Sequence, residues 1–152
     1  MEPIKILFVC TGNTCRSAMA AAMMADIAEK NDLNVLIDSA GIFASIGEGA
    51  ADNAKAVMKK RDIDLSLHRT KPLTEELIGM ADVILTMTSA HKMLIENMAK
   101  DKVFTLLEYA GGEGDIPDPY GGDEEEYEEV ADEICDALVD IAEKLPVCED
   151  EK

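Results

Sequence analysis

The chain has 152 residues, 47% of them hydrophobic, so we predict one packed domain over residues 1–152 and no second core. The formal net charge of −18 argues against binding to nucleic acid or to an anionic membrane surface. No stretch has the apolar length of a membrane span or the layout of a signal peptide, and four cysteines are too few for a disulfide scaffold, so we expect a cytoplasmic protein.

Strand and helix patterns alternate along the chain. Nearly continuous apolar runs predict buried strands over residues 4–9, 34–38, 81–87 and 103–106. Helical spacing and a suitable N-cap at Thr88 predict helices over residues 17–30, 50–60, 89–99 and 123–145. The segment over residues 108–122 holds five Gly and two Pro and is expected to be a loop.

This alternation predicts an α/β fold class. We expect a three-layer, doubly wound parallel sheet of about four strands, with helices on both faces and right-handed crossovers. Ligands of such folds bind beyond the carboxyl ends of the strands. The residues that carry chemistry are therefore expected where the strands end, above all after the first one.

A phosphate loop is predicted at the end of the first strand. The segment that leads from this strand into the next helix reads Cys10, Thr11, Gly12, Asn13, Thr14, Cys15, Arg16 and Ser17. In such a loop successive backbone N–H groups can surround an anion, and the helix dipole adds to the attraction. Gly12 and Asn13 tolerate positive φ angles, and the planar guanidinium of Arg16 can hold two phosphate oxygens.

Cys10 would lie at the base of this positive bowl. The setting favours the thiolate, which can attack a bound phosphorus atom in line. Ser17 could donate a hydrogen bond to this thiolate and help it leave a covalent intermediate. The spacing Cys-x5-Arg alone is common, but its place at a strand-to-helix turn makes the motif specific.

The loop VCTGNTCRSAMA resembles the signature of the low-molecular-weight protein phosphatase family, and the similarity covers nearly the whole chain. The resemblance implies a cysteine-dependent protein phosphatase that forms a phosphocysteine intermediate and whose partners are phosphorylated substrate proteins. One departure is Ala18, where many relatives have Pro in the first helical turn. Pro preorganises a helix start, so Ala costs some rigidity but removes no catalytic group.

The resemblance also implies a general acid. Asp118-Pro119-Tyr120 matches the Asp-Pro-aromatic motif of the family, so Asp118 would protonate the leaving group and later act as base on the attacking water. Asp115 competes for this role within the same loop, but no Pro and aromatic residue follow it. Tyr120 would form one wall of the pocket and Phe43 the opposite one, although a lone Phe is as often a core residue.

Supporting residues are expected behind the phosphate loop. Ser39 lies in a segment that resembles one of the family, and His68 resembles a family histidine; both would hold Asn13, although a purely structural His68 is left open. His91 is interpreted as a helix-surface residue without a role. The two histidines are isolated and the carboxylates match no calcium loop, so neither a metal nor another cofactor is expected.

Several functions share this loop. Thr14 favours a protein-arginine phosphatase, because that branch resembles CTGNTCRS while the protein-tyrosine-phosphatase branch usually carries a branched aliphatic residue here. A thioredoxin-coupled arsenate reductase would need extra cysteines midway along the chain, and residues 81–99 contain none. A phosphocysteine carrier without turnover would need neither Arg16 nor a general acid. The predicted function is therefore phosphoarginine hydrolysis, with tyrosine phosphatase as the alternative.

Overall fold

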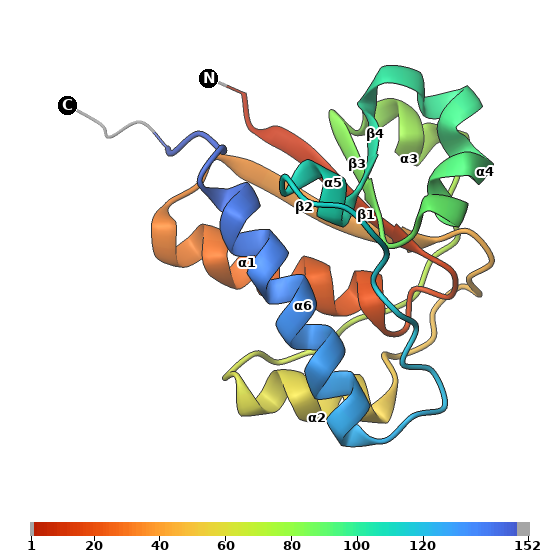
Figure 1. The fold of residues 1–152 in the computed structure, drawn as a ribbon, viewed down its shortest axis with the longest axis vertical. Coiled ribbons are helices and arrows are strands. Elements are labelled where there is room, and N and C mark those ends of the chain that lie inside the picture. Colours follow the sequence, from red (N-terminus) through yellow and green to blue (C-terminus); the bar gives the residue numbers. More distant parts are fainter. Residues whose placement is uncertain (1, 149–152) are drawn as a thin grey trace.

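The computed structural model describes residues 2–148, and residues 1 and 149–152 of the predicted domain lie outside the described residues. A four-stranded parallel sheet forms its centre, in the order β2-β1-β3-β4 (Figure 1). The strands are β1 (Ile4–Cys10), β2 (Val35–Gly41), β3 (Val83–Thr86) and β4 (Val103–Thr105). The helices are α1 (Arg16–Asn31), α2 (Asp52–Lys60), α3 (Glu75–Met80), α4 (Ser89–Ala99), α5 (Leu106–Tyr109) and α6 (Glu124–Ala142), with a 3-10 turn at Lys100–Lys102.

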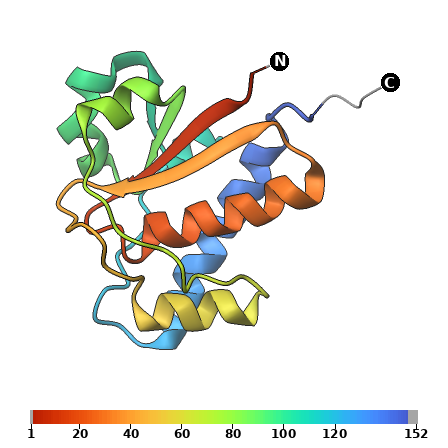
Figure 2. The same cartoon turned by 180° about the vertical axis from the view of Figure 1, so that it is seen from behind.

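The sheet is buried on both faces. Ile6 and Phe8 of β1 point into a core shared with α1, α2 and α6. Leu7 and Val9, which alternate with them, point into a second core shared with α3 and α4. Because successive side chains of a strand face opposite sides, one apolar run serves both cores. Figure 2 shows the helices on the two faces, so the predicted three-layer α/β fold is confirmed.

The order of the strands places a topological switch point beside β1. The chain passes from β1 to β2 on one side and then to β3 on the other side. The loops that leave β1 and β3 therefore diverge at their carboxyl ends, which opens a crevice there. Cys10 is the last residue of β1 and pairs in register with Gly41, the last residue of β2.

Two short helices were not predicted. The expected fourth strand ends one residue early because Thr105 starts a helix: its hydroxyl accepts from the N–H of Glu108, and the Glu108 carboxylate accepts from the N–H of Thr105. Thr74 caps α3 in a similar way through the N–H of Leu77. Helices of four and six residues carry too little periodic pattern to be recognised in a sequence.

The long acidic helix α6 begins one residue later than predicted, at Glu124, and ends three residues earlier, at Ala142. Asp123 caps it by accepting the N–H of Glu126 at 2.9 Å. The acidic residues of its first turn lie at the positive end of the helix dipole, which stabilises them. Over residues 2–148, no helix combines the length and the apolar character that crossing a bilayer requires.

Candidate active site

The loop over residues 11–15 joins β1 to α1 at the switch point. α1 begins at Arg16 with no side-chain cap, so its first N–H groups remain open toward the loop. Within the described part of the chain, the backbone N–H groups of residues 12–15 donate to no protein acceptor. Asn13 takes a φ of 60°, so the positive φ falls on this residue and not on Gly12. Such a turn of open N–H groups forms an anion-binding concavity.

A short contact joins Cys10 to Ser17. Both side chains are buried, and Cys10 Sγ lies 2.9 Å from Ser17 Oγ. Ser17 Oγ already accepts a hydrogen bond from the Asn13 amide at 2.8 Å, and its only alternative acceptor, the Ala40 carbonyl, lies 3.4 Å away. The Ser17 hydroxyl proton therefore points toward Cys10, where it stabilises a thiolate.

Asn13 is the hub of the loop. Its amide nitrogen donates to Ser17 and, at 3.0 Å, to Ser39 Oγ, and its amide oxygen accepts the N–H of Lys71 at 3.1 Å. His68 Nε2 donates to the Asn13 carbonyl at 2.7 Å. The structure thus places Ser39 and His68 directly against Asn13. With its amide fully bonded, Asn13 holds the strained left-handed turn that opens the loop.

Arg16 connects the loop to the Gly-rich segment that carries the two aspartates. Its side chain is buried, and Nη1 donates to the Ile116 carbonyl at 3.0 Å. Nη2 lies 3.6 Å from Asp118 Oδ2. Because the Asp118 side chain is 52% exposed, water screens this ion pair and it adds little stability. The guanidinium nevertheless lies between the loop and the aspartate, in position to reach both.

Asp115 and Asp118 have different partners. Asp115 Oδ1 accepts the N–H of Ser89 at 2.8 Å, so it satisfies the first residue of α4. Asp118 Oδ1 accepts the N–H of Tyr120 at 3.0 Å, and its other oxygen faces Arg16. Asp115 is thus engaged in holding the β3–α4 turn, whereas Asp118 faces the loop. This arrangement favours Asp118 as the acid.

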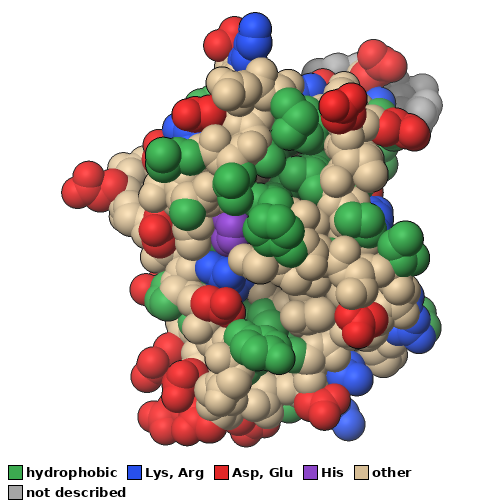
Figure 3. Space-filling view, turned by 90° about the vertical axis from the view of Figure 1, so that its right-hand side faces the viewer, with side chains coloured by type: hydrophobic (Ala, Val, Ile, Leu, Met, Phe, Trp, Pro, Cys, Tyr) green, Lys and Arg blue, Asp and Glu red, His purple; other side chains and the backbone are tan. Residues whose placement is uncertain are grey.

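These groups surround one hollow of about 240 Å³. It is lined by Cys10, Thr11, Gly12, Thr14, Cys15, Arg16, Asp118 and Tyr120. On the face drawn in Figure 3, a histidine and a basic side chain lie side by side, with an acidic side chain below them. Phe43 is exposed and its N–H donates to the Thr11 carbonyl, but its side chain does not line the hollow. The role of Phe43 as the wall opposite Tyr120 therefore stays a prediction.

Comparison with known proteins identifies the arrangement. The family model described as low molecular weight phosphotyrosine protein phosphatase matches residues 5–148. The chain belongs to this family. It is a phosphatase. The hollow above Cys10 is lined by residues of the loop that the sequence predicted to bind phosphate.

Relatives of this phosphatase carry two kinds of name. The protein-arginine-phosphatase of Bacillus subtilis (strain 168) is 46% identical, and the match covers 92% of this chain and 95% of that protein. The low molecular weight protein-tyrosine-phosphatase PtpB of Staphylococcus epidermidis is 38% identical, with 90% and 95% covered. A solved structure of a YwlE arginine phosphatase mutant with a phosphorylated active-site serine is 44% identical, with a TM-score of 0.89 and 93% and 95% covered.

His91 was wrongly interpreted as a surface residue of the phosphatase. It is buried in the first turn of α4, and its Nε2 lies 2.9 Å from Thr11 Oγ1 in the phosphate loop. Burial, and next the nearby Arg16 guanidinium, lower the pKa of His91. Its place three residues after the cap Thr88, at the carboxyl end of a strand next to β1, was the signal that could have revealed it.

Tyr127 is a second residue that the sequence analysis missed. This buried residue of α6 places its hydroxyl 3.2 Å from Cys15 Sγ. Burial, more than any other cause, raises the pKa of the Cys15 thiol. Thr14 Oγ1 lies 3.5 Å from the same sulfur, which is a weak contact, so the Thr14 hydroxyl keeps most of its hydrogen-bonding capacity for other partners.

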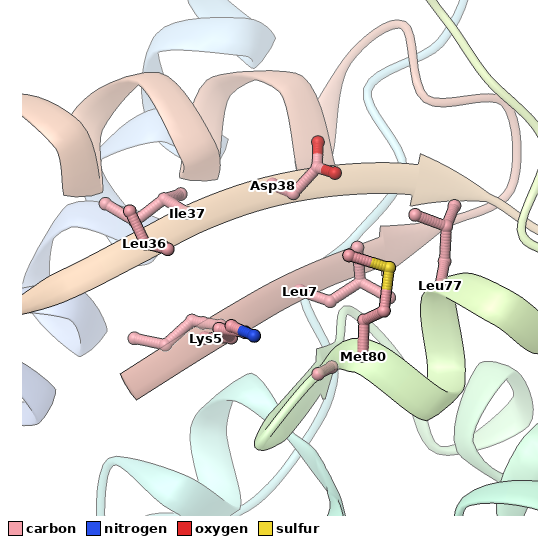
Figure 4. A pocket seen from close by; sticks show the side chains of 9 residues that line it. Lys5, Leu7, Leu36, Ile37, Asp38, Leu77 and Met80 are labelled. Carbon is pink, nitrogen blue, oxygen red and sulfur yellow. The ribbon is translucent and has the colours of Figure 1, made fainter. Parts of the chain in front are cut away.

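A second hollow, of about 230 Å³, lies away from the phosphate loop. Figure 4 shows Leu77 and Met80 of α3 beside Leu7 of β1; Lys5 and Asp38 also belong to the lining of this hollow. Its lining is mostly apolar and includes neither a cysteine nor a histidine, which favours the hollow above Cys10 as the candidate active site. Among residues 2–148, no three His, Cys, Asp or Glu side chains gather as a metal site would require.

Gly41 is expected to be intolerant of any side chain. A Cβ at this position would lie 2.6 Å from the Thr11 carbonyl oxygen and 2.8 Å from the Asn13 nitrogen, both of them backbone atoms of the phosphate loop. Gly41→Ala should therefore displace the loop, lower turnover of an aryl phosphate and destabilise the fold by about 1–3 kcal/mol. Thermal unfolding and initial rates measure the two effects. The control is Gly79→Ala, because nothing lies within 4 Å of a Cβ there; equal activity of both variants would contradict the prediction.

Proposed function

We propose that this phosphatase hydrolyses phosphoarginine residues in proteins, with Cys10 as nucleophile, Arg16 as phosphate clamp and Asp118 as general acid. The choice of phosphoarginine as substrate rests on the similarity to relatives named protein-arginine-phosphatase, which are 46% and 47% identical over nearly the whole chain. The relatives named tyrosine phosphatases are 38% or 34% identical. The Cys10 nucleophile needs a reduced thiol, which fits a reducing, cytoplasmic setting.

The first step transfers the phosphoryl group to Cys10. The phosphoryl oxygens accept from the open N–H groups of residues 12–15 and from Arg16, which neutralise their charge without a metal ion. The Cys10 thiolate attacks phosphorus in line, an S–P bond forms and the P–N bond of phosphoarginine breaks. Asp118 gives its proton to the departing guanidine nitrogen, so arginine leaves as a stable group.

The second step hydrolyses the phosphocysteine. Asp118, now a carboxylate, takes a proton from a water molecule that attacks phosphorus from the side the arginine has left. The S–P bond breaks and its electron pair returns to Cys10. The Ser17 hydroxyl, 2.9 Å from Cys10 Sγ, stabilises the thiolate that departs. Inorganic phosphate is released. The proton that Asp118 has taken from the water molecule restores it as an acid for the next cycle.

Substrate choice has to come from the walls of the hollow, because both phosphoarginine and phosphotyrosine need a proton from the acid. Thr14 lines the hollow, and its hydroxyl has only the weak contact with Cys15. It can therefore orient water or a guanidinium N–H beside the phosphoryl group. An aliphatic residue of similar size would offer the same packing without that polar contact.

Thr14→Ile is expected to lower kcat/KM for phosphoarginine by roughly 10- to 200-fold, the range for a small change in a binding pocket. Aryl phosphates should hold steady or improve, since their leaving group has no N–H to satisfy. The measurement compares both substrates on wild type and mutant in one buffer, with Thr14→Ser as the control that keeps the hydroxyl. A wild type that prefers phosphotyrosine, or equal loss on both substrates, would shift the assignment to a tyrosine phosphatase.

The tyrosine-phosphatase alternative has an observation of its own. Tyr120 lines the hollow and is 78% exposed, so its ring is free to pack against an aromatic leaving group. Replacing Tyr120 with Leu should then lower the rate of phosphotyrosine hydrolysis more than that of phosphoarginine hydrolysis. Rates of the wild type on the two phosphopeptides, identical apart from the phosphorylated residue, decide between the two functions.

Mild peroxide is expected to link Cys10 and Cys15 reversibly. Peroxide oxidises the Cys10 thiolate to a sulfenic acid, the Cys15 thiol attacks that sulfur, and water leaves as the disulfide forms. Cys10 and Cys15 both line the hollow, and both are free thiols in the structure. Mass spectrometry should find the bridge, with activity restored by dithiothreitol. The Cys15→Ser control should lose activity irreversibly; sulfonic acid on Cys10 in the wild type, without a bridge, would count against the prediction.

A further inference from the structure

The contact between His91 and Thr11 has no part in the mechanism described so far. His91 Nε2 lies 2.9 Å from Thr11 Oγ1, and the His91 residue is 7% exposed. In residues 2–148, its other nitrogen, Nδ1, is fully buried and has no hydrogen-bond partner. Thr11 itself is exposed and lines the hollow above Cys10.

The unpartnered Nδ1 decides which atom carries the histidine proton. If Nε2 accepted a hydrogen bond from the Thr11 hydroxyl, then Nδ1 of the neutral ring would carry the proton and be a buried N–H donor without an acceptor, a rare and costly state. If Nε2 carries the proton, Nδ1 is only a buried lone pair, which is better tolerated. The lowered pKa of His91 agrees with a neutral ring near pH 7. Nε2–H therefore donates to Thr11 Oγ1.

This donation fixes the direction of the Thr11 hydroxyl proton. Oγ1 accepts from His91, so its own proton has to point elsewhere, and the side chain borders the hollow. Across the hollow, Asp118 accepts from Tyr120 with one oxygen and faces Arg16 with the other. A substrate would bring phosphoryl oxygens into the hollow, and these are strong acceptors, whereas a guanidine leaving group offers mainly N–H donors.

We propose that the Thr11 hydroxyl donates a hydrogen bond to a phosphoryl oxygen of the substrate and that His91 positions it for this contact. The inference rests on the proposed function only in that a phosphoryl group occupies the hollow. Thr11 then adds a side-chain donor to the backbone N–H groups and Arg16. His91 touches no substrate and acts through Thr11 alone.

The test uses variants that keep the shape of each residue. Thr11→Val removes the hydroxyl, and Thr11→Ser keeps it; His91→Leu removes the ring nitrogen, and His91→Gln restores an N–H donor in nearly the same place. Inorganic phosphate serves as the probe, and its inhibition constant is measured against an aryl phosphate and a phosphoarginine peptide. Circular dichroism and thermal unfolding check that each variant is folded.

Thr11→Val is expected to raise the inhibition constant of phosphate and to lower kcat/KM for both substrates by roughly 10- to 100-fold, as for loss of a hydrogen bond to a charged group. Thr11→Ser and His91→Gln should stay close to wild type. His91→Leu should lower kcat/KM in the wild-type background. In the Thr11→Val background it should lower kcat/KM almost no further, because both substitutions remove the same contact.

Two results would overturn the proposal. One is an unchanged inhibition constant of phosphate in a folded Thr11→Val variant. The other is an equal effect of His91→Leu with and without the Thr11 hydroxyl, which would make His91 a packing residue. Failure of the arginine assignment is distinguishable, since it would appear as a preference of the wild type for phosphotyrosine while the phosphate contact of Thr11 persisted.

Discussion

Replacing Cys10 with serine is expected to abolish turnover while phosphate still binds. In the proposed mechanism the anion is held by the N–H groups of residues 12–15 and by Arg16, and the substitution alters neither. A serine hydroxyl in this place is a far weaker nucleophile than a thiolate, because its pKa in water is several units higher than that of a thiol. The Ser17 hydroxyl, which stabilises the thiolate, cannot take up the proton of a second hydroxyl.

The measurement has two parts. Turnover of an aryl phosphate should fall to the background rate, while isothermal titration with inorganic phosphate should still detect binding. Cys135→Ser is the matched control, because Cys135 lies on α6 and does not line the hollow. Rapid quenching of the wild type should trap phosphate on Cys10. Phosphate trapped on any other residue would show that Cys10 is not the nucleophile.

Asp118→Asn is expected to lower kcat by about 10²–10⁴-fold, the usual contribution of a general acid. The loss should grow as the leaving group becomes more basic, because a good leaving group departs without a proton. The kcat for phosphoarginine should fall strongly, whereas the kcat for p-nitrophenyl phosphate should fall least. A plot of rate against leaving-group pKa, for wild type and variant, measures the difference in slope.

Asp115→Asn is the matched control for the acid. Asp115 accepts the N–H of Ser89 at the start of α4, so its replacement should weaken this helix end and leave the leaving-group dependence unchanged. An asparagine can still accept that N–H, which keeps the loop in place. If Asp115→Asn steepened the dependence while Asp118→Asn behaved as wild type, the two aspartates would exchange roles.

The phosphate loop and the order of the layers were predictable from sequence, since both depend on local pattern. Cys10 and Arg16 delimit a strand-to-helix turn, and the apolar run from Ile4 to Val9 predicts a strand buried on two faces. Ser39 and His68 were placed near Asn13 through resemblance alone. Nothing in their own neighbourhood shows that segments 26 and 55 residues away from Asn13 meet it.

The residues that were missed depend on tertiary contacts. His91 looks like one of many polar residues on a helix, and only the pairing of β3 with β1 brings it 2.9 Å from Thr11. Tyr127 lies in an acidic run of α6, where its ring was indistinguishable from an ordinary core residue. Periodicity shows that such a side chain is buried, but it does not show which atom its polar end touches.

The hydrogen bond from Arg16 to the Ile116 carbonyl bears on which step limits the rate of the reaction. The segment that carries Asp118 is fastened at Ile116 from two sides, by Arg16 and by the Met87 carbonyl, before any substrate arrives. Many enzymes close a lid to assemble the site, and its opening then limits kcat. If Asp118 is the acid, as proposed, substrate binding requires no ordering at Ile116, and we expect kcat to follow bond breaking at phosphorus rather than the opening of a lid.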